Sequence, residues 1–235
     1  MLDAWLRIRD HLAEDLFGGP RLLKMAWVID LQKGGTLLFV LGLMWWFDVW
    51  TATAWTYATL HGSYGLLWLM KDRLFPDPNW EKRVTFGAAV AAWVLVLGPY
   101  WIAPVILVTQ RVEAPPALLA GATLLYVLGA VTMMVADAHK YFVLKVKRGL
   151  ITDGLFGLVR HPNYLGEMML YASFALIVQH WLPWLVLAWV WTTVFLPNML
   201  RKEARMSRHP GWEAYRARTG MLLPKPWRTR TPTPT

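Results

Sequence analysis

The sequence predicts an all-α integral membrane protein with about seven transmembrane helices. Hydrophobic residues fill 56% of the 235 positions and Trp alone occurs 16 times, which is more apolar than an ordinary soluble domain. The apolar residues gather in long runs, and a helix that crosses a bilayer needs about 20 of them. Both observations indicate one compact domain that is embedded in the lipid bilayer.

The charges and the absence of cysteine exclude several other classes. The chain has no Cys, so neither a disulfide nor a Cys-ligated metal site can contribute, and its six His show no pair at metal-ligand spacing. The formal net charge is +9, but the basic residues flank apolar runs and no nucleic-acid motif accompanies them. We therefore expect neither a metal site nor a nucleic-acid partner.

An interfacial amphipathic helix is expected over residues 1–20. This stretch lacks the continuous apolar core and the cleavage site of a signal peptide. Its apolar residues recur on one side, as in a helix that lies in the membrane interface. They are Leu2, Trp5, Leu6, Ile8, Leu12 and Leu16.

Seven apolar stretches follow along the chain. Gly98-Pro99 separates the third from the fourth, because proline breaks a helix, and Gln179-His180 joins the last two as a hairpin. We expect five spans and the substrate cavity in 21–136, two spans and the cofactor site in 137–224, and a disordered tail at 225–235. The expected spans are 22–46, 51–70, 84–97, 100–109, 114–135, 164–178 and 182–196.

Two strongly basic stretches, 140–160 and 201–218, follow the fifth and seventh spans and therefore lie on one side of the membrane. The positive-inside rule assigns that side to the cytoplasm. The cofactor site and the C-terminus are then expected in the cytoplasm, and the N-terminus on the other side. Seven spans also put four basic residues on the non-cytoplasmic side, against the same rule: Lys71, Arg73, Lys82 and Arg83.

Polar side chains meet an apolar run between residues 154 and 167. Asn163 and Glu167 are four residues apart, so they lie on one helix face. Ionisable groups at membrane depth are costly and mark functional sites by default. With Arg160, His161 and Tyr164 they form the candidate wall of a pocket.

Basic residues before and after this motif form a candidate anion site. Lys and Arg on adjacent helix ends suit a phosphate, and the alternative is a fringe of cytoplasmic charge without a ligand. The chain has no Gly-x-Gly-x-x-Gly after a strand and no Walker motif, so a nucleotide site here is neither a Rossmann nor a P-loop site. The basic residues are Lys140, Lys147 and Arg148 before the motif, and Arg201, Arg205 and His209 at a spacing of four after it.

The second expected span carries the candidate catalytic pair, Tyr64 and His61, three residues apart. In the first span, Asp30 and Lys33 either pair with each other at the interface or line the same cavity. A phenol in an apolar pocket can polarise a carbonyl and supply a proton, tuned by a His or an acid nearby. We therefore take Tyr64, His61 and Asp30 as candidate catalytic residues. The alternative for Tyr64 is a buried phenol that needs only a hydrogen-bond partner.

Several segments between residues 137 and 224 occur together in one known family. They are Asp137-Ala-His-Lys140, Gly154-Leu-Phe156, Arg160-His-Pro-Asn-Tyr-Leu-Gly-Glu167, Arg205 with His209, Trp212-Glu-Ala-Tyr215 and Leu223-Pro224. This part of the chain resembles the C-terminal half of the membrane steroid reductases, which include the steroid 5α-reductases and the sterol reductases. The resemblance implies a steroid-reductase-like bundle that uses NADPH to reduce an activated carbon–carbon double bond.

The resemblance also implies roles for individual residues. Asn163 and Glu167 would hold the nicotinamide end, and Tyr64 would polarise the ketone of a lipophilic enone, most concretely a 3-oxo-Δ4 steroid. The N-terminal half matches less well, because the Gln-Glu dipeptide that the 5α-reductase branch pairs with its Tyr does not occur here. We expect a monomer. The expected cofactor-binding set is Lys140, Lys147, Arg148, Arg160, His161, Asn163, Tyr164, Glu167, Arg201, Arg205, His209 and Tyr215.

Two alternatives remain open at this point. Isoprenylcysteine-type carboxyl methyltransferases share a similar Arg-His-Pro-x-Tyr-x-Gly signature but bind S-adenosylmethionine. They generally carry a Glu-Glu pair after the last span, where this chain has Lys202-Glu203, so the reductase interpretation fits better. The second alternative is a membrane protein without enzymatic activity that binds a lipid or a partner.

Overall fold

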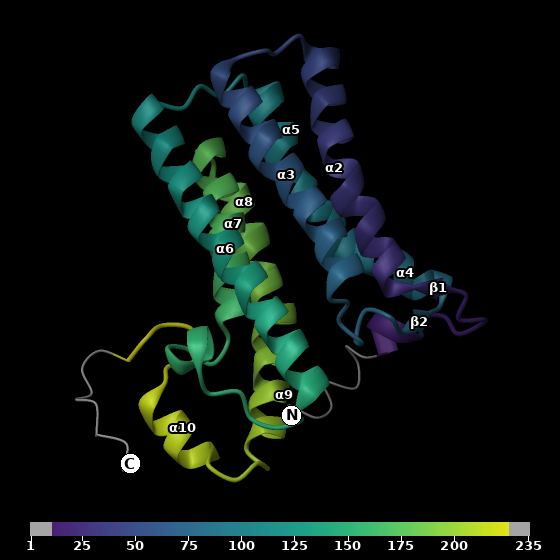
Figure 1. Ribbon diagram of the computed structural model, residues 1–235. Coiled ribbons are helices and arrows are strands. Elements are labelled where there is room, and N and C mark those ends of the chain that lie inside the picture. Colours follow the sequence, from purple (N-terminus) through teal and green to yellow (C-terminus); the bar gives the residue numbers. More distant parts are fainter. Residues whose placement is uncertain (1–10, 226–235) are drawn as a thin grey trace.

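The computed structural model describes residues 11–225, which form a mostly helical bundle (Figure 1). Six helical rods run along the bundle. They are α2 (Met25–Phe47), α3 (Ala52–Leu74), the α4–α5 rod (Phe86–Ala92, η1 Trp93–Leu97, η2 Gly98–Trp101 and Ile102–Thr109), α6 (Pro116–Val146), α7 (Pro162–Val178) and the α8–α9 rod (Trp181–Val190, η4 Trp191–Phe195 and Leu196–Met206). The expected helical class is therefore confirmed, with one short two-stranded sheet beside the helices.

The helix starts follow from local sequence. The side chain of Thr51 accepts a hydrogen bond from the backbone N–H of Ala54 at 3.2 Å, and Thr85 caps α4 in the same way. α6 and α7 begin with Pro116 and Pro162, which are tolerated in the first turn because its N–H groups have no partner within the helix. The hairpin predicted at Gln179-His180 is confirmed, since α7 ends at Val178 and α8 begins at Trp181.

The prediction that Gly98-Pro99 separates two spans is wrong. Helical structure continues from Phe86 to Thr109 as one rod of 24 residues. The proline is accommodated because the five residues of η1 before it form a wider π-helical segment, which relieves the clash of the proline ring with the preceding turn. Spans three and four are therefore one rod, and the expected count of about seven is not confirmed.

The α8–α9 rod has the same device. Pro197 follows the π-helical segment η4, just as Pro99 follows η1. Pro99 has no N–H for the carbonyl oxygen of Leu95, four residues earlier, and the indole N–H of Trp189 donates to that oxygen at 2.9 Å. A hydrogen bond from α8, two residues before η4, thus joins the α8–α9 rod to η1.

Four of the rods are long and apolar enough to cross a membrane: Met25–Phe47, Phe86–Thr109, Pro116–Val146 and Trp181–Met206. The other two rods, α7 and α3, do not meet both conditions, each for its own reason. α7 has only 17 residues, and most of its side chains are covered by neighbouring helices. α3 ends in the charged run Lys71-Asp72-Arg73. The membrane class predicted from composition is therefore supported by these apolar helices.

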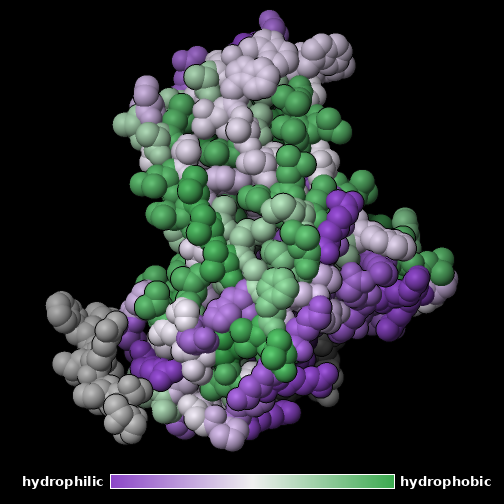
Figure 2. Space-filling view, viewed as in Figure 1, coloured by the Kyte–Doolittle hydropathy of each residue, from purple (hydrophilic) through white to green (hydrophobic). Residues whose placement is uncertain are grey.

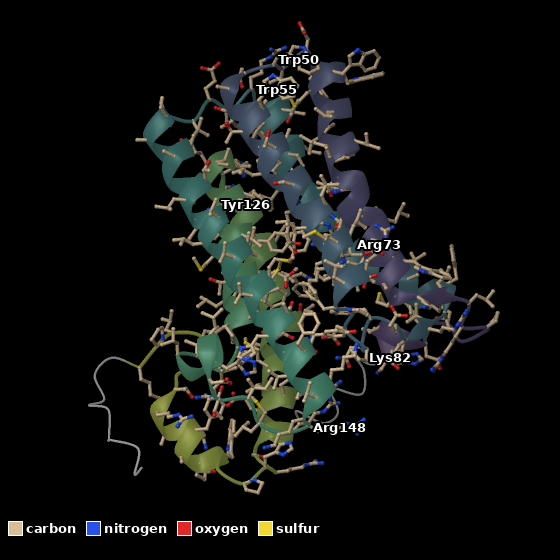
Figure 3. The ribbon with its side chains drawn as sticks, in the orientation of Figure 1. Trp50, Trp55, Arg73, Lys82, Tyr126 and Arg148 are labelled. Carbon is tan, nitrogen blue, oxygen red and sulfur yellow. The ribbon has the colours of Figure 1, made fainter. Side chains whose placement is uncertain are left out.

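The two ends of the bundle differ in chemistry (Figures 2 and 3). Trp50 and Trp55 lie at one end, Lys82 and Arg148 lie in the opposite half, and Arg73 lies between them. A largely hydrophobic surface covers the rods between them, and hydrophilic residues gather in the lower part of the view (Figure 2). Exposed Trp at one end and basic residues at the other are typical of helices held between two membrane interfaces.

Short elements gather at the basic end. β1 (Leu23–Lys24) pairs antiparallel with β2 (Arg83–Val84), and η3 (Gly154–Gly157) packs near α10 (Trp212–Arg218). Of the expected interfacial helix, residues 1–10 lie outside the described residues, and residues 11–14 are helical. Of the expected tail, residues 226–235 lie outside the described residues.

Glycines set the two closest helix contacts. A Cβ atom at Gly166 in α7 would lie 2.6 Å from the carbonyl oxygen of Gly129 in α6. A Cβ atom at Gly65 in α3 would overlap the carbonyl oxygen of Lys33 in α2. Small residues of this kind let helix backbones approach closely in membranes. The first contact fixes the motif helix α7 against α6, and the second brings Lys33 beside Tyr64.

Candidate functional site

A cavity of about 450 Å³ lies between the rods and reaches the basic end of the bundle. Asn163 and Glu167 both line it, which confirms that the two side chains share one face of α7. Tyr164 lines it as well, with its ring 5.0 Å from that of Phe195. A volume of this size lies within the range of ordinary ligand pockets.

A buried polar network closes the inner end of the cavity. Lys33 is only 4% exposed and donates hydrogen bonds to the hydroxyl groups of Tyr64, at 3.2 Å, and Tyr171. The Tyr64 hydroxyl donates in turn to Oε1 of Glu167 at 3.0 Å. We call these four residues the inner network. The network joins α2, α3 and α7. Its hydrogen bonds stabilise the Lys33 ammonium group, whose burial without partners would cost free energy.

Aromatic rings surround the Lys33 ammonium group. Its Nζ atom lies 4.5 to 5.4 Å from the ring centroids of Tyr64, Tyr171, Tyr100 and Trp68. Tyr100 and Tyr171 stack nearly parallel, with centroids 4.0 Å apart. Cation–π attraction to these rings helps to hold the ammonium group away from water. Lys33, Tyr100 and Tyr171 all line the cavity.

The opposite end of the cavity is rich in charge. Arg201, Lys202 and Arg205 of α9 line it, and the Lys202 ammonium lies 4.6 Å from the ring centroid of Tyr164. Counted over the described lining residues, six basic side chains face four acidic ones. The remaining charged lining residues are Lys33, Lys71, Lys82, Glu14, Asp77, Asp137 and Glu167. Without Lys33 and Glu167, which belong to the inner network, five basic side chains face three acidic ones, and this excess favours an anion in this part of the cavity.

Ion pairs anchor several of these charges. Lys71 and Asp137 approach to 2.6 Å and both side chains are nearly buried, at 11% and 7% exposure. Lys140 pairs with Asp77 at 3.0 Å and approaches Asp137 at 3.8 Å. Burial alone would raise the pKa of Asp77, but the Lys140 ammonium and the N–H of Asn79 hold that pKa well below its usual range. These pairs tie α3 and the following loop to α6.

The segments at the basic end also contribute to the cavity wall. Leu12, Glu14 and Lys82 line it, and Lys82 and Glu14 form an ion pair at 2.7 Å. Thr85 binds this N-terminal segment too, since its hydroxyl donates to the carbonyl oxygen of Leu16 at 3.0 Å. The described part of the segment is thus packed on the protein beside the cavity.

An apolar wall lies between the two ends. It is formed by the two π-helical segments and their neighbours, including Leu95, Val96, Val190 and Val194. Their side chains are partly or largely exposed apart from Val190, which is 1% exposed. Such a wall suits an apolar ligand.

Three of the expected cofactor residues have structural contacts instead. Nε of Arg160 lies 2.7 Å from Oε1 of Glu203, and Nε2 of His161 lies 3.0 Å from the same oxygen. Tyr215 donates from its hydroxyl to the carbonyl oxygen of Phe156 at 2.9 Å. Burial lowers the pKa of His161, although the Glu203 carboxylate acts in the opposite direction. These contacts hold the loop before α7 against α9 and α10, beside the cavity and outside its described wall.

Four of the other basic candidates also lie outside the cavity wall. Lys140 is held by Asp77, and Lys147, Arg148 and His209 are exposed and absent from the described lining. Of the twelve residues expected to bind a cofactor, the structure brings five together along the cavity. They are Asn163, Tyr164, Glu167, Arg201 and Arg205.

None of the three catalytic candidates is part of the described cavity wall. Tyr64 is completely buried and contacts the lining residues Lys33, Glu167 and Tyr171. His61 faces another direction, because its Nδ1 lies 3.0 Å from the Tyr57 hydroxyl and its ring stacks on Phe174. Asp30 does not line the described part of the cavity either. The expected grouping of Asp30, His61 and Tyr64 is therefore not found.

Several lining residues were missed by the sequence reasoning. For Lys33 the structure decides between the two alternatives, since it lines the cavity with Glu167, whereas Tyr171 was expected only as part of an apolar span. Tyr171 lies four residues after Glu167 and eight after Asn163, so the spacing that links those two could have found it. Tyr100 and Lys71 carry no such signal, because they come from other helices.

Comparison with known proteins gives a family and two relatives. A family model described as "Protein of unknown function (DUF1295)" matches residues 79–219. The uncharacterized protein C7D4.09c of Schizosaccharomyces pombe is 38% identical over 74 residues, which cover 28% of this chain and 24% of that protein. The uncharacterized protein C594.04c of the same organism is 30% identical over 97 residues, which cover 39% of this chain and 28% of that protein. The chain thus spans about a quarter of the length of the curated relatives it matches.

Proposed function

Because the chain belongs to the DUF1295 family, whose description names no activity, we propose its function from the cavity: NADPH-dependent reduction of an activated carbon–carbon double bond in a lipophilic enone. One observation carries the proposal. A single cavity has an amide and a carboxylate, Asn163 and Glu167, toward its inner end and Arg201, Lys202 and Arg205 toward its basic end. The resemblance of residues 137–224 to membrane steroid reductases supports the same activity.

The lining residues fit the chemical groups of NADPH. A nicotinamide carboxamide has both donor and acceptor atoms, which suit the Glu167 carboxylate and the Asn163 amide. Its phosphates suit Arg201, Lys202 and Arg205, because guanidinium groups bind phosphate oxygens in a bidentate manner and lysine adds a point charge. When bound, NADPH supplies the hydride for the reduction.

The residues of the chain would orient and polarise the substrate. The inner network presents hydroxyl groups and an ammonium group, which can hydrogen-bond to a carbonyl oxygen and stabilise the negative charge that forms on it. The aromatic rings around Lys33 exclude water from this end, which strengthens such interactions. Tyr64 contributes by holding Lys33 and Glu167 in place.

The apolar wall supports a lipophilic substrate. Leu95, Val96 and Val194 lie beside the cavity where both rods are π-helical. A 3-oxo-Δ4 steroid is the most concrete candidate, since it combines an enone with a rigid apolar body. The substrate would reach this wall from the bilayer.

We also propose that the basic end faces the cytoplasm. With six rods, Lys82 and Arg148 lie in the same half of the bundle (Figure 3), and Arg73 lies in the last turn of α3 before Lys82. The conflict with the positive-inside rule that seven spans create then disappears. The cofactor site would open toward the compartment that supplies NADPH, with both described chain ends on that side.

The test mixes the purified protein with NADPH and each member of a panel of enones. The fall in NADPH absorbance measures the reduction. Glu167→Gln keeps the shape of the side chain and removes its charge, and Arg205→Gln removes one cation from the basic end. We expect each to weaken NADPH binding by about tenfold, or about 1.4 kcal/mol. Tyr126→Phe is the control, because the Tyr126 hydroxyl contacts Ser63 at 2.8 Å outside the described cavity wall. Wild-type protein that oxidises no NADPH with any enone contradicts the proposal.

A further inference from the structure

We propose that Lys82 is a further anion-binding residue of the cavity, and that Glu14 competes with the anion for the Lys82 side chain. Glu14 belongs to residues 11–16, which we call the strap. This assignment rests on the proposed function only in taking the natural anion to be the pyrophosphate group of a dinucleotide. Inorganic pyrophosphate carries the same chemistry without the nicotinamide.

The strap lies along the basic end of the cavity. Leu12, Ala13 and Glu14 line the cavity together with Lys82, which lies in the basic half of the bundle (Figure 3). Oε1 of Glu14 lies 2.7 Å from Nζ of Lys82. A cation in the wall of an anion site is thus paired with a carboxylate of the chain itself. A phosphate oxygen can take the place of that carboxylate, because lysine binds either group as a point charge.

This ion pair can be exchanged more easily than the others in the cavity wall. The side chains of Lys82 and Glu14 are 53% and 34% exposed, whereas those of Lys71 and Asp137 are only 11% and 7% exposed. An exposed ion pair stabilises a protein little, because water solvates both charges, while breaking a buried pair is costly. An anion that enters the basic end therefore takes Lys82 from Glu14 more readily than it takes Lys71 from Asp137.

The backbone of the strap has a hinge next to it. Thr85 binds the strap, donating from its N–H to the carbonyl oxygen of Glu14 at 3.2 Å and from its hydroxyl to that of Leu16 at 3.0 Å. Residues 17–19 follow, all of them exposed and with positive φ, and a Cβ atom on either of the two glycines would meet nothing within 4 Å. Small exposed residues are typical hinges, since they change φ and ψ without a clash. The strap can therefore turn away while the rods stay in place.

The test measures the binding of inorganic pyrophosphate to the full chain in detergent by calorimetry. Glu14→Gln keeps the size of the side chain and removes the competing charge, so it should strengthen pyrophosphate binding about threefold. Because both charges are exposed, this gain should shrink as salt is added. Glu81→Gln is the matched control and should leave the affinity unchanged. Glu81 forms a similar exposed ion pair with Lys24, at 2.6 Å, and neither residue is part of the described cavity wall.

A double-mutant cycle separates competition for Lys82 from a general effect of charge. Lys82→Gln should weaken pyrophosphate binding about threefold or more, and Glu14→Gln should then change little in that background. An equal gain from Glu14→Gln in both backgrounds overturns the inference, and so does an unchanged affinity in the single variant. Absence of pyrophosphate binding in every variant overturns it as well.

Gly87→Ala displaces the strap without changing any charge. A Cβ atom at Gly87 would lie 2.4 Å from the carbonyl oxygen of Leu16, so the strap has to move away from α4. Pyrophosphate binding should become tighter, as in Glu14→Gln, and the absence of a gain contradicts the competition. Unfolding temperatures check that each variant is folded. Glu14→Gln changes only a partly exposed side chain and carries the test should Gly87→Ala fail to fold.

Failure of this inference can be told from failure of the proposed function. A protein that binds pyrophosphate more tightly as Glu14→Gln, but binds no NADPH, refutes the proposed function and supports the competition. A protein that binds NADPH, and binds pyrophosphate equally well with Glu14 and with Gln in its place, refutes the competition and leaves the proposed function standing.

Discussion

Replacing Gly166 by Ala should destabilise the bundle where it carries the candidate site. A Cβ atom there would lie 2.5 Å from the backbone N of Met133 and 2.6 Å from the carbonyl oxygen of Gly129. Ordinary contact begins near 3.4 Å, so α6 and α7 would have to separate by about 0.9 Å, the difference between 3.4 and 2.5. Both obstacles are backbone atoms, which cannot rotate away.

Overpacking of this kind typically costs about 1–3 kcal/mol. For a chain of this length that loss lowers the unfolding temperature by about 2–12 °C. The assay is thermal unfolding of the detergent-solubilised protein. Gly121→Ala in α6 is the control, because nothing lies within 4 Å of a Cβ atom at that position. It should stabilise the helix by about 0.5–1 kcal/mol, since Ala replaces Gly in a helix interior.

The same change should weaken cofactor binding. Asn163 and Glu167 flank Gly166 on α7 and line the cavity, so a shift of the helix moves both side chains. The reasoning is refuted if Gly166→Ala unfolds at or above the wild-type temperature, because the contact between α6 and α7 would then not be close in solution.

Three further changes test other parts of the structure. Trp189→Phe removes the donor to the Leu95 carbonyl oxygen and should cost about 1 kcal/mol of unfolding free energy, whereas Trp184→Phe on the same helix should cost less. Asp137→Asn leaves the nearly buried Lys71 without its partner and should cost about 3 kcal/mol, measured by thermal unfolding. Burial lowers the pKa of His161 in the folded protein. The stability that the neutral imidazole contributes is therefore complete above the unfolded-state pKa of about 6.5, and it is lost as the pH falls through the lower folded-state pKa. His161→Gln should remove this dependence of the unfolding free energy on pH.

Each of these has a result that contradicts it. Equal losses in the two Trp variants would mean that the indole hydrogen bond does not stabilise the kinked rods. An Asp137→Asn protein as stable as wild type would mean that Lys71 finds another partner or is hydrated. An unchanged pH profile of unfolding in His161→Gln would assign the pH dependence to other groups.

The sequence allowed the membrane class, the hairpin at Gln179-His180 and the shared face of Asn163 and Glu167 to be predicted. These features depend on composition, on a local turn and on spacing within one helix, which are all local properties. The number of spans was not predictable in the same way. Whether a proline ends a helix or follows a π-helical segment depends on its surroundings. At Pro99, the carbonyl oxygen of Leu95 accepts a hydrogen bond from the indole of Trp189, which lies in a rod far along the chain.

The inner network depends on contacts between helices. Lys33 looked like an interfacial partner of Asp30, because the two are three residues apart. Its true neighbours come from α3 and α7, and they are reached because Gly65 lets α2 and α3 approach closely. The contact of Arg160 also comes from another helix. A basic side chain in a motif can bind a ligand or hold the motif in place, and here the Arg160 side chain binds Glu203 of α9.

The central claim, that this cavity is a dinucleotide site, is tested most directly by ligand-dependent thermal unfolding of the purified protein. NADPH at about a hundred times its dissociation constant should add about 2.7 kcal/mol of stability, and S-adenosylmethionine should add none. Glu167→Gln should reduce the NADPH effect at the same concentration, and Tyr126→Phe should retain it. Stabilisation by S-adenosylmethionine but not by NADPH, or by neither, would contradict the claim.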